Sequence, residues 1–370
     1  MAVFTPVFSA SPWILALFPP ILTVRGGIGG IFSGNLATMM HLGLVKPRIR
    51  GNTEQYRGLI KSVIVITVMD TLVLGAFSFM VNIINGSAHL GQWFLFISVP
   101  TVACTLAVCL SIPITSLIAI ETFKRGLDPD ILVYPILASI NDIVVTVFFV
   151  SVVFLNLWGG VFYWFFTAIF VAIICVVGYL AVKSRDDVFF QQTIREGTFV
   201  VILSSVFGGI NGVFLSNLGP SLTAMPGLMT MYPALTNALG NVGSIIGSKT
   251  TTDIALGYSK SFMEELKESG KRIVQVEVPA AFMHVVFGVI AFILSMGQGA
   301  ALMPLIGVAL SCNLMSFIII TVFALWSAHL AFERGLNPDN VVIPAITSVS
   351  DTTATLALTP AIMVSRLLGF

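Results

Sequence analysis

Long apolar stretches, separated by short polar and basic segments, run through the whole chain. A helix that crosses the hydrocarbon core of a membrane needs about 20 mainly apolar residues, and about ten stretches of that length can be drawn. None of them shows the alternation, in segments of about ten residues, that the strands of a membrane barrel require. The pattern therefore predicts an all-α polytopic membrane protein. The expected transmembrane helices are 12–44, 58–84, 93–121, 130–156, 160–183, 197–217, 223–256, 275–297, 301–328 and 340–366.

The composition agrees with this prediction. Of the 370 residues, 56% are hydrophobic and 9% are charged, whereas a soluble domain carries about 25% charged residues. We therefore expect membrane lipid as the surrounding partner, and we expect no nucleic-acid partner. The four cysteines all lie inside apolar stretches. This placement is typical of packing residues and indicates neither a disulfide framework nor a metal cluster.

Basic residues gather in every second gap between the expected helices. The opposite gaps, at 85–92, 156–160 and 297–300, contain no Lys or Arg. Loops that carry an excess of Lys and Arg face the cytoplasm. The bias therefore predicts cytoplasmic basic loops, both chain ends on the other side, and a place in the cell or plasma membrane. The basic loop residues are Lys46, Arg48, Arg50, Arg57, Lys124, Arg125, Lys183, Arg185, Arg195, Lys260, Lys267, Lys271, Arg272 and Arg334.

An internal repeat organises the chain. Residues 123–142 read F-K-R-G-L-D-P-D-I-L-V-Y-P-I-L-A-S-I-N-D, and 332–351 read F-E-R-G-L-N-P-D-N-V-V-I-P-A-I-T-S-V-S-D, a separation of 209 positions. The Pro-Ile-Leu-Thr of 20–23 likewise returns as Pro-Ala-Leu-Thr at 233–236. Equivalent helices separated by an even number of crossings have the same orientation, which predicts a parallel repeat about an axis along the membrane normal. The expected division is a first repeat at 1–156, a return-crossing helix and linker at 157–196, and a second repeat at 197–370.

Each copy of the repeat carries one aspartate deep in an apolar stretch, Asp142 and Asp351. Pro129 and Pro338 suit the first turn of a helix. Asp142 follows Pro129 by 13 residues, or about 20 Å along a helix, which puts it near the middle of the bilayer. A carboxylate at that depth is costly, and its default interpretation is functional. Two of them at equivalent positions predict a paired site.

The segment P-A-L-T-N-A-L-G-N-V-G-S at 233–244, followed by G-L-x-P-D…P…S-x-x-D, resembles the MgtE magnesium channels and the related solute carrier family 41. The resemblance implies two five-helix units around one pore that is lined by an aspartate from each unit. Here both units lie in one chain, which implies a single-chain pseudo-dimer and Mg²⁺ as the transported ion. Two departures stand out. Residues 25–30 read R-G-G-I-G-G, so the Gly-Asn pair is replaced and an arginine is gained, and no loop is long enough for the nucleotide-binding CBS domains of the bacterial channels.

The chemistry of the residues also favours a hard divalent cation. Two carboxylates with hydroxyl and carbonyl oxygens suit Mg²⁺, which keeps most of its waters, whereas no His or Cys is placed for a softer metal. Besides the two aspartates, the candidate ligands are Ser139, Ser348, Asn141 and Ser350. The candidate pore or entrance residues are Asn241, Gly240, Gly243, Asp128, Asp130, Asp339 and Asp70.

Structural roles compete with several of these assignments. Each paired aspartate could instead form an ion pair with Arg25 or Lys249, the two candidate bases inside the membrane. The acids beside Pro129 and Pro338 could simply cap a helix. Asp70 is either a second ion or proton site or the partner of Arg25. Asn241 and its neighbouring glycines allow close helix contact or line a pore.

The resulting hypothesis is transport of Mg²⁺, with other divalent cations as further candidates, by a pseudo-symmetric channel or carrier. The alternatives are a cation-coupled transporter of a small solute and an intramembrane aspartyl enzyme. The enzyme is disfavoured because both aspartates lie in near-identical repeats, and because the chain has neither a Gly-x-Gly-Asp loop nor an H-E-x-x-H helix. We therefore expect a transporter and not an enzyme. The sequence leaves open whether cations flow down a gradient or are exchanged for Na⁺ or H⁺.

Overall fold

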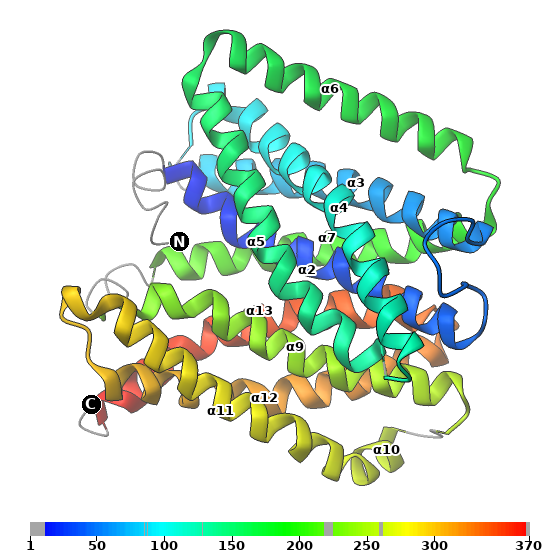
Figure 1. Ribbon diagram of the computed structural model, residues 1–370. Coiled ribbons are helices and arrows are strands. Elements are labelled where there is room, and N and C mark those ends of the chain that lie inside the picture. The colour runs from blue at the N-terminus through cyan, green and yellow to red at the C-terminus, as the bar shows by residue number, and fades with distance from the viewer. Residues whose placement is uncertain are drawn as a thin grey trace.

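The computed structural model describes residues 12–84, 86, 88–127, 129–217, 225–258 and 262–367. In these ranges the chain forms helices and no strand (Figure 1). Two 3₁₀ helices, η2 (Leu90–Gln92) and η3 (Met296–Gln298), precede α4 and α12. The α-helices are α2 (Pro12–His41), α3 (Glu54–Ile84), α4 (Trp93–Lys124), α5 (Pro129–Trp158), α6 (Gly160–Lys183), α7 (Val188–Asn217), α9 (Leu228–Ala255), α10 (Phe262–Glu268), α11 (Gly270–Ser295), α12 (Leu302–Glu333) and α13 (Pro338–Leu367).

Eight spans in the described part are long and apolar enough to cross a membrane. This finding confirms the predicted all-α polytopic fold. Two further long helices, α2 with 30 residues and α9 with 28, carry the repeated Pro and Gly motifs. The prediction missed the short helix α10. It also began the sixth helix at 197, whereas α7 begins at Val188, because its first turns are built from Gln, Arg and Glu, which favour a helix outside the apolar core.

The helices form two groups with separate apolar cores. The first half, α2 to α5, supplies most of one cluster of buried apolar side chains. The second half, α9 and α11 to α13, supplies the other. The halves meet where α5 packs against α9 and where α13 packs against α2. In Figure 1, α6 lies at one edge of the molecule and α10 and α11 lie at the opposite edge.

Helix α7 joins the two halves. It packs against α2 and α3 of the first half and against α13 of the second. Small residues allow this close contact: a Cβ on Gly208 would lie 3.1 Å from Cα of Pro20, and a Cβ on Gly209 would lie 2.5 Å from the ring of Phe77. Position 197, the expected start of the second repeat, therefore lies inside a continuous helix that contacts both halves.

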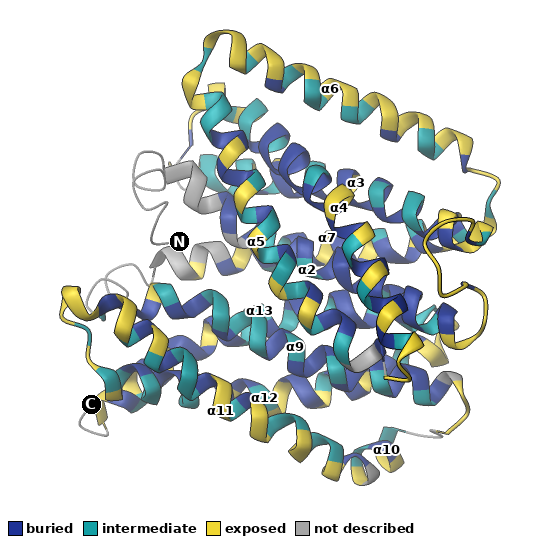
Figure 2. Cartoon of the chain, in the orientation of Figure 1, coloured by how far each residue is buried: buried dark blue, intermediate teal, exposed yellow. Residues whose placement is uncertain are grey.

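Equivalent glycines bring α2 and α9 onto α13. A Cβ on Gly30 of α2 would lie 2.2 Å from the side chain of Ile343, and one on Gly243 of α9 would lie 2.5 Å from Ile346. Gly243 follows Gly30 by 213 positions, the same separation as the two Pro-x-Leu-Thr segments. The repeated glycines therefore set how closely the interior helices pack. Figure 2 shows the result, with mainly buried residues along α2 and α13 and mainly exposed residues along α6.

Candidate cation site between the two halves

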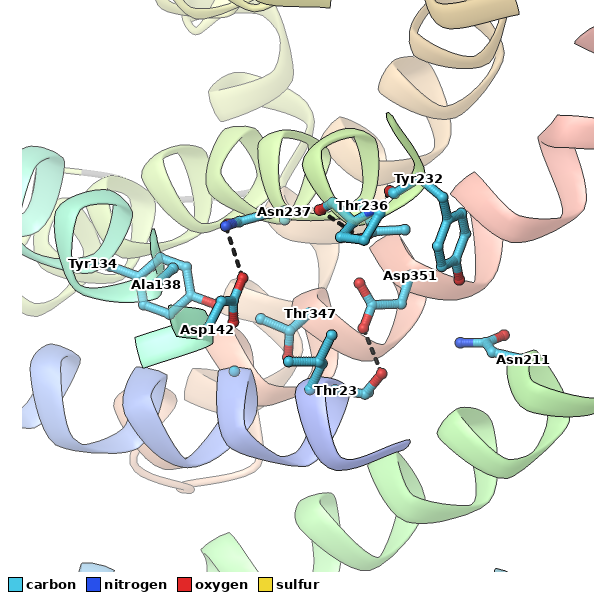
Figure 3. A pocket seen from close by; sticks show the side chains of 14 residues that line it. Thr23, Tyr134, Ala138, Asp142, Asn211, Tyr232, Thr236, Asn237, Thr347 and Asp351 are labelled. Carbon is cyan, nitrogen blue, oxygen red and sulfur yellow. Dashed lines mark hydrogen bonds between the residues drawn. The ribbon is translucent and has the colours of Figure 1, made fainter. Parts of the chain in front are cut away.

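A small cavity lies where α2, α5, α7, α9 and α13 meet (Figure 3). Its volume is about 60 Å³, and a buried water needs at least about 10–15 Å³ of such space, so several waters fit. Polar side chains from all five helices reach it. The lining residues are Leu22, Thr23, Gly26, Tyr134, Ala138, Asp142, Asn211, Tyr232, Pro233, Thr236, Asn237, Gly240, Thr347 and Asp351.

The structure brings the two predicted aspartates together in this cavity. Asp142 of α5 and Asp351 of α13 both line it, and their carboxylates interact electrostatically. Each lies 13 residues after the proline that begins its helix, near the middle of a 30-residue helix. The proline at the first helical position fixes where the helix begins, because its missing N–H would have no partner there. The common spacing therefore gives the two carboxylates the same position along their helices.

Each aspartate accepts a hydrogen bond from the opposite half of the molecule. Nδ2 of Asn237 in α9 donates to Oδ2 of Asp142 at 2.9 Å, and Oγ1 of Thr23 in α2 donates to Oδ2 of Asp351 at 2.6 Å. Figure 3 shows both bonds at the wall of the cavity. The α2 and α9 helices, which carry the repeated Pro-x-Leu-Thr segment, thus hold the carboxylate of the other half in place.

The four polar residues predicted to assist the aspartates do not line the cavity. Ser139 is exposed and donates to the carbonyl of Pro135, whereas Ser348 is buried and donates to Ser204 of α7. Asn141 lies beside Gly29 of α2. Ser350 packs near Gly243 of α9. The preceding residue is rotated by about 100° from the carboxylate and faces another side of the helix. The residues that share the cavity face with the aspartates are those four positions earlier, Ala138 and Thr347.

Of the candidate pore glycines, only Gly240 lines the cavity, and a Cβ there would have no atom within 4 Å. Gly243 is instead a contact point, because its Cβ would lie 2.5 Å from Ile346 and 2.6 Å from Ile320. Asn241 lies between them and outside the cavity wall. The predicted close helix contact is therefore found at Gly243, whereas Gly240 faces the cavity, and its role as pore wall stays a prediction.

The acids expected at the entrance lie away from the cavity or outside the described part. Asp339 is buried in the first turn of α13, and its backbone N–H donates to Oδ1 of Asn337. Asp130 belongs to the first turn of α5, but its side chain lies outside the described part. Asp128 as a whole also lies outside the described part. The structure therefore gives no open acidic entrance formed by Asp339.

Arg25 and Asp70 are both buried but have different partners. Arg25 Nη2 donates to Oγ of Ser111 in α4 at 2.6 Å, and Ser205 of α7 donates to Asp70 Oδ1 at 2.6 Å. Among the ion pairs of the described residues, none joins Arg25 to Asp70, and none holds Asp142 or Asp351. The alternative in which Asp70 is the partner of Arg25 is therefore wrong, as judged from the described residues. Arg25 nevertheless acts electrostatically on Asp142.

Sequence reasoning missed the neutral residues of the wall. Thr23 and Asn237 bind the carboxylates, and Tyr134, Tyr232 and Thr347 complete the polar surface. Thr23 carried a usable signal, because it recurs as Thr236 in the repeated Pro-x-Leu-Thr segment, and Thr236 also lines the cavity. Asn237 follows Thr236 directly but has valine at the equivalent place of the first repeat, so the repeat could not identify it.

The cavity combines two carboxylates with neutral oxygens. In the described ranges, no three His, Cys, Asp or Glu side chains gather as a cage for a resident metal ion. Two carboxylates, several neutral oxygens and space for water remain. A cation held this way keeps part of its hydration shell, which makes its release easier than from a closed coordination shell.

Comparison with known proteins agrees with this chemistry. A family model described as MgtE, divalent cation transporter, matches residues 18–152 and 232–360, which together make up more than half of the chain. Solute carrier family 41 member 3 of Rattus norvegicus is 22% identical over 95% of this chain and 79% of its own length. The same member of Mus musculus is 21% identical over 95% of this chain and 75% of its own length.

A second mouse relative, solute carrier family 41 member 2, is 22% identical over 95% of this chain and 64% of its own length. No solved structure matches the chain. The family match extends over both halves and includes the helices that carry Asp142 and Asp351. The chain therefore belongs to the MgtE family of divalent cation transporters and is an integral membrane protein of that transporter class.

Proposed function

We propose that this protein carries Mg²⁺ across the membrane through the central cavity, with Asp142 and Asp351 as the two charged groups that receive the ion. The observation that carries the proposal is that these two repeat-equivalent carboxylates line one cavity. The family match supports a divalent cation as the cargo. The choice of Mg²⁺ among divalent cations comes from the chemistry of the cavity wall.

Charge balance favours a doubly charged cation. Two ionised carboxylates in a site of low dielectric constant repel each other, and a neighbouring cation relieves that repulsion. A divalent ion balances both charges at once, whereas a monovalent ion leaves one uncompensated. Mg²⁺ is usually bound by one or two carboxylates and keeps several waters. The cavity has space for waters, and Thr23, Thr236 and Thr347 offer them oxygens to contact.

The same arrangement supports a pore within one chain. Each half contributes one carboxylate, and α2 and α9 hold them by hydrogen bonds across the boundary between the halves. The protein would then act as a single-chain pseudo-dimer. In Figure 1, the loops after α2, α4 and α6 lie at the end opposite to the beginning of α2 and the end of α13. We assign this basic end to the cytoplasm and the protein to the cell or plasma membrane.

The size of the cavity disfavours the alternative cargo. Pockets that bind small organic molecules usually have volumes of about 300–1,000 Å³, whereas this cavity has about 60 Å³. An organic solute would require the helices around Asp142 and Asp351 to separate. Family membership likewise points to transport and not to proteolysis by an aspartate pair.

The test is Mg²⁺ uptake into proteoliposomes by purified full-length protein. We expect Asp142→Asn and Asp351→Asn each to reduce uptake by about tenfold or more, because each removes one of the two charges that balance the ion. Ser139→Ala is the matched control: it lies one helical turn from Asp142 but is exposed and outside the cavity. Uptake at the level of the unsubstituted protein by either Asn variant would refute the paired site. Uptake of Ca²⁺ or Mn²⁺ in preference to Mg²⁺ would refute the choice of ion.

A further inference from the structure

A second and much larger cavity opens on the first half, away from the central site. Its volume is about 1080 Å³, and it lies between the loop that follows α2, the end of α4 and the beginning of α5. We call it the basic groove. Its floor is apolar and includes Leu117, Leu132 and Ile136. Its rim carries four basic residues, Arg48, Arg50, Lys124 and Arg125.

The second half contains the counterpart of this groove. A smaller cavity of about 310 Å³ lies between α12, α13 and α7. Its residues Trp326, Arg334 and Ala345 lie 209 positions after Leu117, Arg125 and Ile136 of the basic groove. The two cavities are therefore the same feature of the repeat, formed once in each half.

The two cavities differ in what covers them. Helix α7 lies over the second one and brings Phe199 and Val200 to its wall. In the described part of the chain, no helix lines the basic groove in the place of α7. The consequence is visible at one pair of equivalent serines: Ser348 of α13 is buried and bonded to Ser204 of α7, whereas Ser139 of α5 is exposed.

The uncovered surface is apolar and continues along α5 from the groove. Ile136, Ile143 and Val147 are 44%, 67% and 51% exposed, and they follow one face of the helix. In the second half, Ala345, the equivalent of Ile136, lines a cavity together with Phe199 and Val200 of α7, whereas Leu356, the equivalent of Val147, is 46% exposed. The occupant of the basic groove must therefore offer a long apolar body to α5.

The occupant must also offer negative charge. Among the described lining residues, Glu121 is the acidic one, and it already binds Arg125 at 2.8 Å. Arg48 donates to the carbonyl of Gly51, and neither Arg50 nor Lys124 takes part in an ion pair of the described residues. Covering these cations with an uncharged helix would remove them from water without compensation. An anionic group that accepts their hydrogen bonds compensates for this loss.

We propose that the basic groove binds an anionic phospholipid of the leaflet on the basic-loop side, with its phosphate at the arginines and its acyl chains along α4 and α5. Anionic lipids concentrate in cytoplasmic leaflets, and basic pockets between transmembrane helices bind their headgroups. The forked guanidinium of arginine suits a phosphate in particular. The lipid occupies the place that α7 occupies in the other half, and this proposal stands whether or not Asp142 and Asp351 carry the ion.

Native mass spectrometry of the full-length protein tests the proposal. Phosphatidylglycerol and phosphatidylcholine with identical acyl chains are added in parallel, and retention of each is compared. We expect phosphatidylglycerol to bind more tightly, and Arg50→Gln with Lys124→Gln to weaken it on the order of tenfold. The matched control is Lys183→Gln with Lys271→Gln, which removes the same charge at the same end of the molecule but outside the groove. The control should retain the lipid preference.

Three outcomes would overturn the proposal. Equal retention of both lipids means that charge does not select the occupant. Equal loss in the groove variant and in the control means that the lipid follows overall charge. A dimer that dissociates in Arg50→Gln with Lys124→Gln, without lipid preference, means that a second copy covers the groove.

A photoreactive phosphatidylglycerol, labelled in its acyl chain, gives a second readout on the unsubstituted protein. We expect crosslinks to the segment 117–136, and we expect Ile136→Trp to reduce them by filling the apolar floor. Crosslinks restricted to α6 or α11, the exposed helices at the two edges, would refute the site. This measurement does not depend on the folding of any arginine variant.

Discussion

The two aspartates of the central cavity are held by neutral donors. Thr23 binds Asp351 and Asn237 binds Asp142, and neither carboxylate forms an ion pair within the described part of the chain. A neutral donor fixes the position of a carboxylate oxygen while leaving its negative charge uncompensated. A basic partner would fix the oxygen and cancel the charge that the cation needs. In the proposed function, the hydrogen bonds hold the carboxylates in position and leave their charge for the cation.

Removing one of these donors should weaken transport without destroying it. We expect Thr23→Val to reduce Mg²⁺ uptake about tenfold, because a hydrogen bond to a charged group contributes about 1.5–3 kcal/mol. Valine keeps nearly the same shape, so the loss reports the hydroxyl. Thr353→Val is the control, since Thr353 bonds within its own helix and does not line the cavity. Equal uptake by the two variants would mean that the Thr23 bond has no role in holding Asp351.

Arg25 is a buried basic residue of the first half that lies near Asp142. It is fully buried, it donates to Ser111, and it interacts electrostatically with Asp142. We expect Arg25→Gln to lower the Mg²⁺ concentration for half-maximal uptake several-fold, because a nearby positive charge repels the entering cation. Glutamine can still donate to Ser111. Arg57→Gln, at the exposed start of α3, is the control. A raised half-maximal concentration would show that Arg25 supports the site.

At the residue scale, the sequence predicted the pair of aspartates but not their neighbours. The repeat places Asp142 and Asp351 at equal depth, and two such acids beside one axis must meet. The spacing of residues along one helix does not predict which neighbouring helix packs against each of its faces. Ser139 and Ser348 are equivalent in sequence, yet α7 covers only Ser348. The recurrence of Thr23 as Thr236 indicates one donor, but the repeat does not indicate Asn237, which has Val24 at the equivalent place.

At the scale of elements, the glycines of α2 and α9 decide how the interior helices pack. Small residues allow close contact between membrane helices, where packing and not water drives association. Gly30 and Gly243 both face isoleucines of α13 at distances that exclude a Cβ. Gly240, one turn from Gly243, faces the open cavity instead. On α9, close packing therefore requires a glycine at position 243, whereas position 240 has space for a Cβ.

This difference gives a matched pair of substitutions. Gly243→Ala places a methyl group 2.5 Å from Ile346 and 2.6 Å from Ile320, and such overpacking typically costs about 1–3 kcal/mol. Gly240→Ala meets no atom within 4 Å and gains up to about 1 kcal/mol of helix propensity. We expect the melting temperature in detergent to fall for Gly243→Ala and to stay equal or rise for Gly240→Ala. The opposite order would mean that α9 is rotated from the orientation described.

The sequence predicted the limits of the helices better than it predicted which helices pack against each other. Hydropathy and the prolines at Pro129 and Pro338 placed most helix limits within a few residues, because both signals are local. The position of α7 could not be predicted in this way. Hydropathy gives the length of a helix, but whether it packs against its own half or the other depends on contacts such as Ser204 with Ser348 and Gly208 with Pro20.

At the scale of the whole molecule, the two halves are joined at the centre by reciprocal contacts. Donors on α2 and α9 each bind the carboxylate of the opposite half, and α7 packs across the boundary on one side. The two donors are not equivalent positions of the repeat, since Thr23 corresponds to Thr236 and Asn237 to Val24. The surface is asymmetric as well, because α7 covers one groove and leaves the other open. A site built from both halves needs no second copy of the chain to supply a carboxylate.

The last prediction tests whether one chain contains the whole site. Cysteines replace Asp142 and Asp351 in a protein whose four native cysteines, Cys104, Cys109, Cys175 and Cys312, have been replaced. Because both positions line one cavity of about 60 Å³, the two thiols lie within reach of one Cd²⁺ ion, which soft thiolate ligands favour. We expect Cd²⁺ to protect the pair from a thiol reagent while the protein stays monomeric. Either single-cysteine protein is the control and should not be protected. Protection found only in a dimer would mean that two chains build the pore, and no protection at all would mean that the two helices do not meet at these residues.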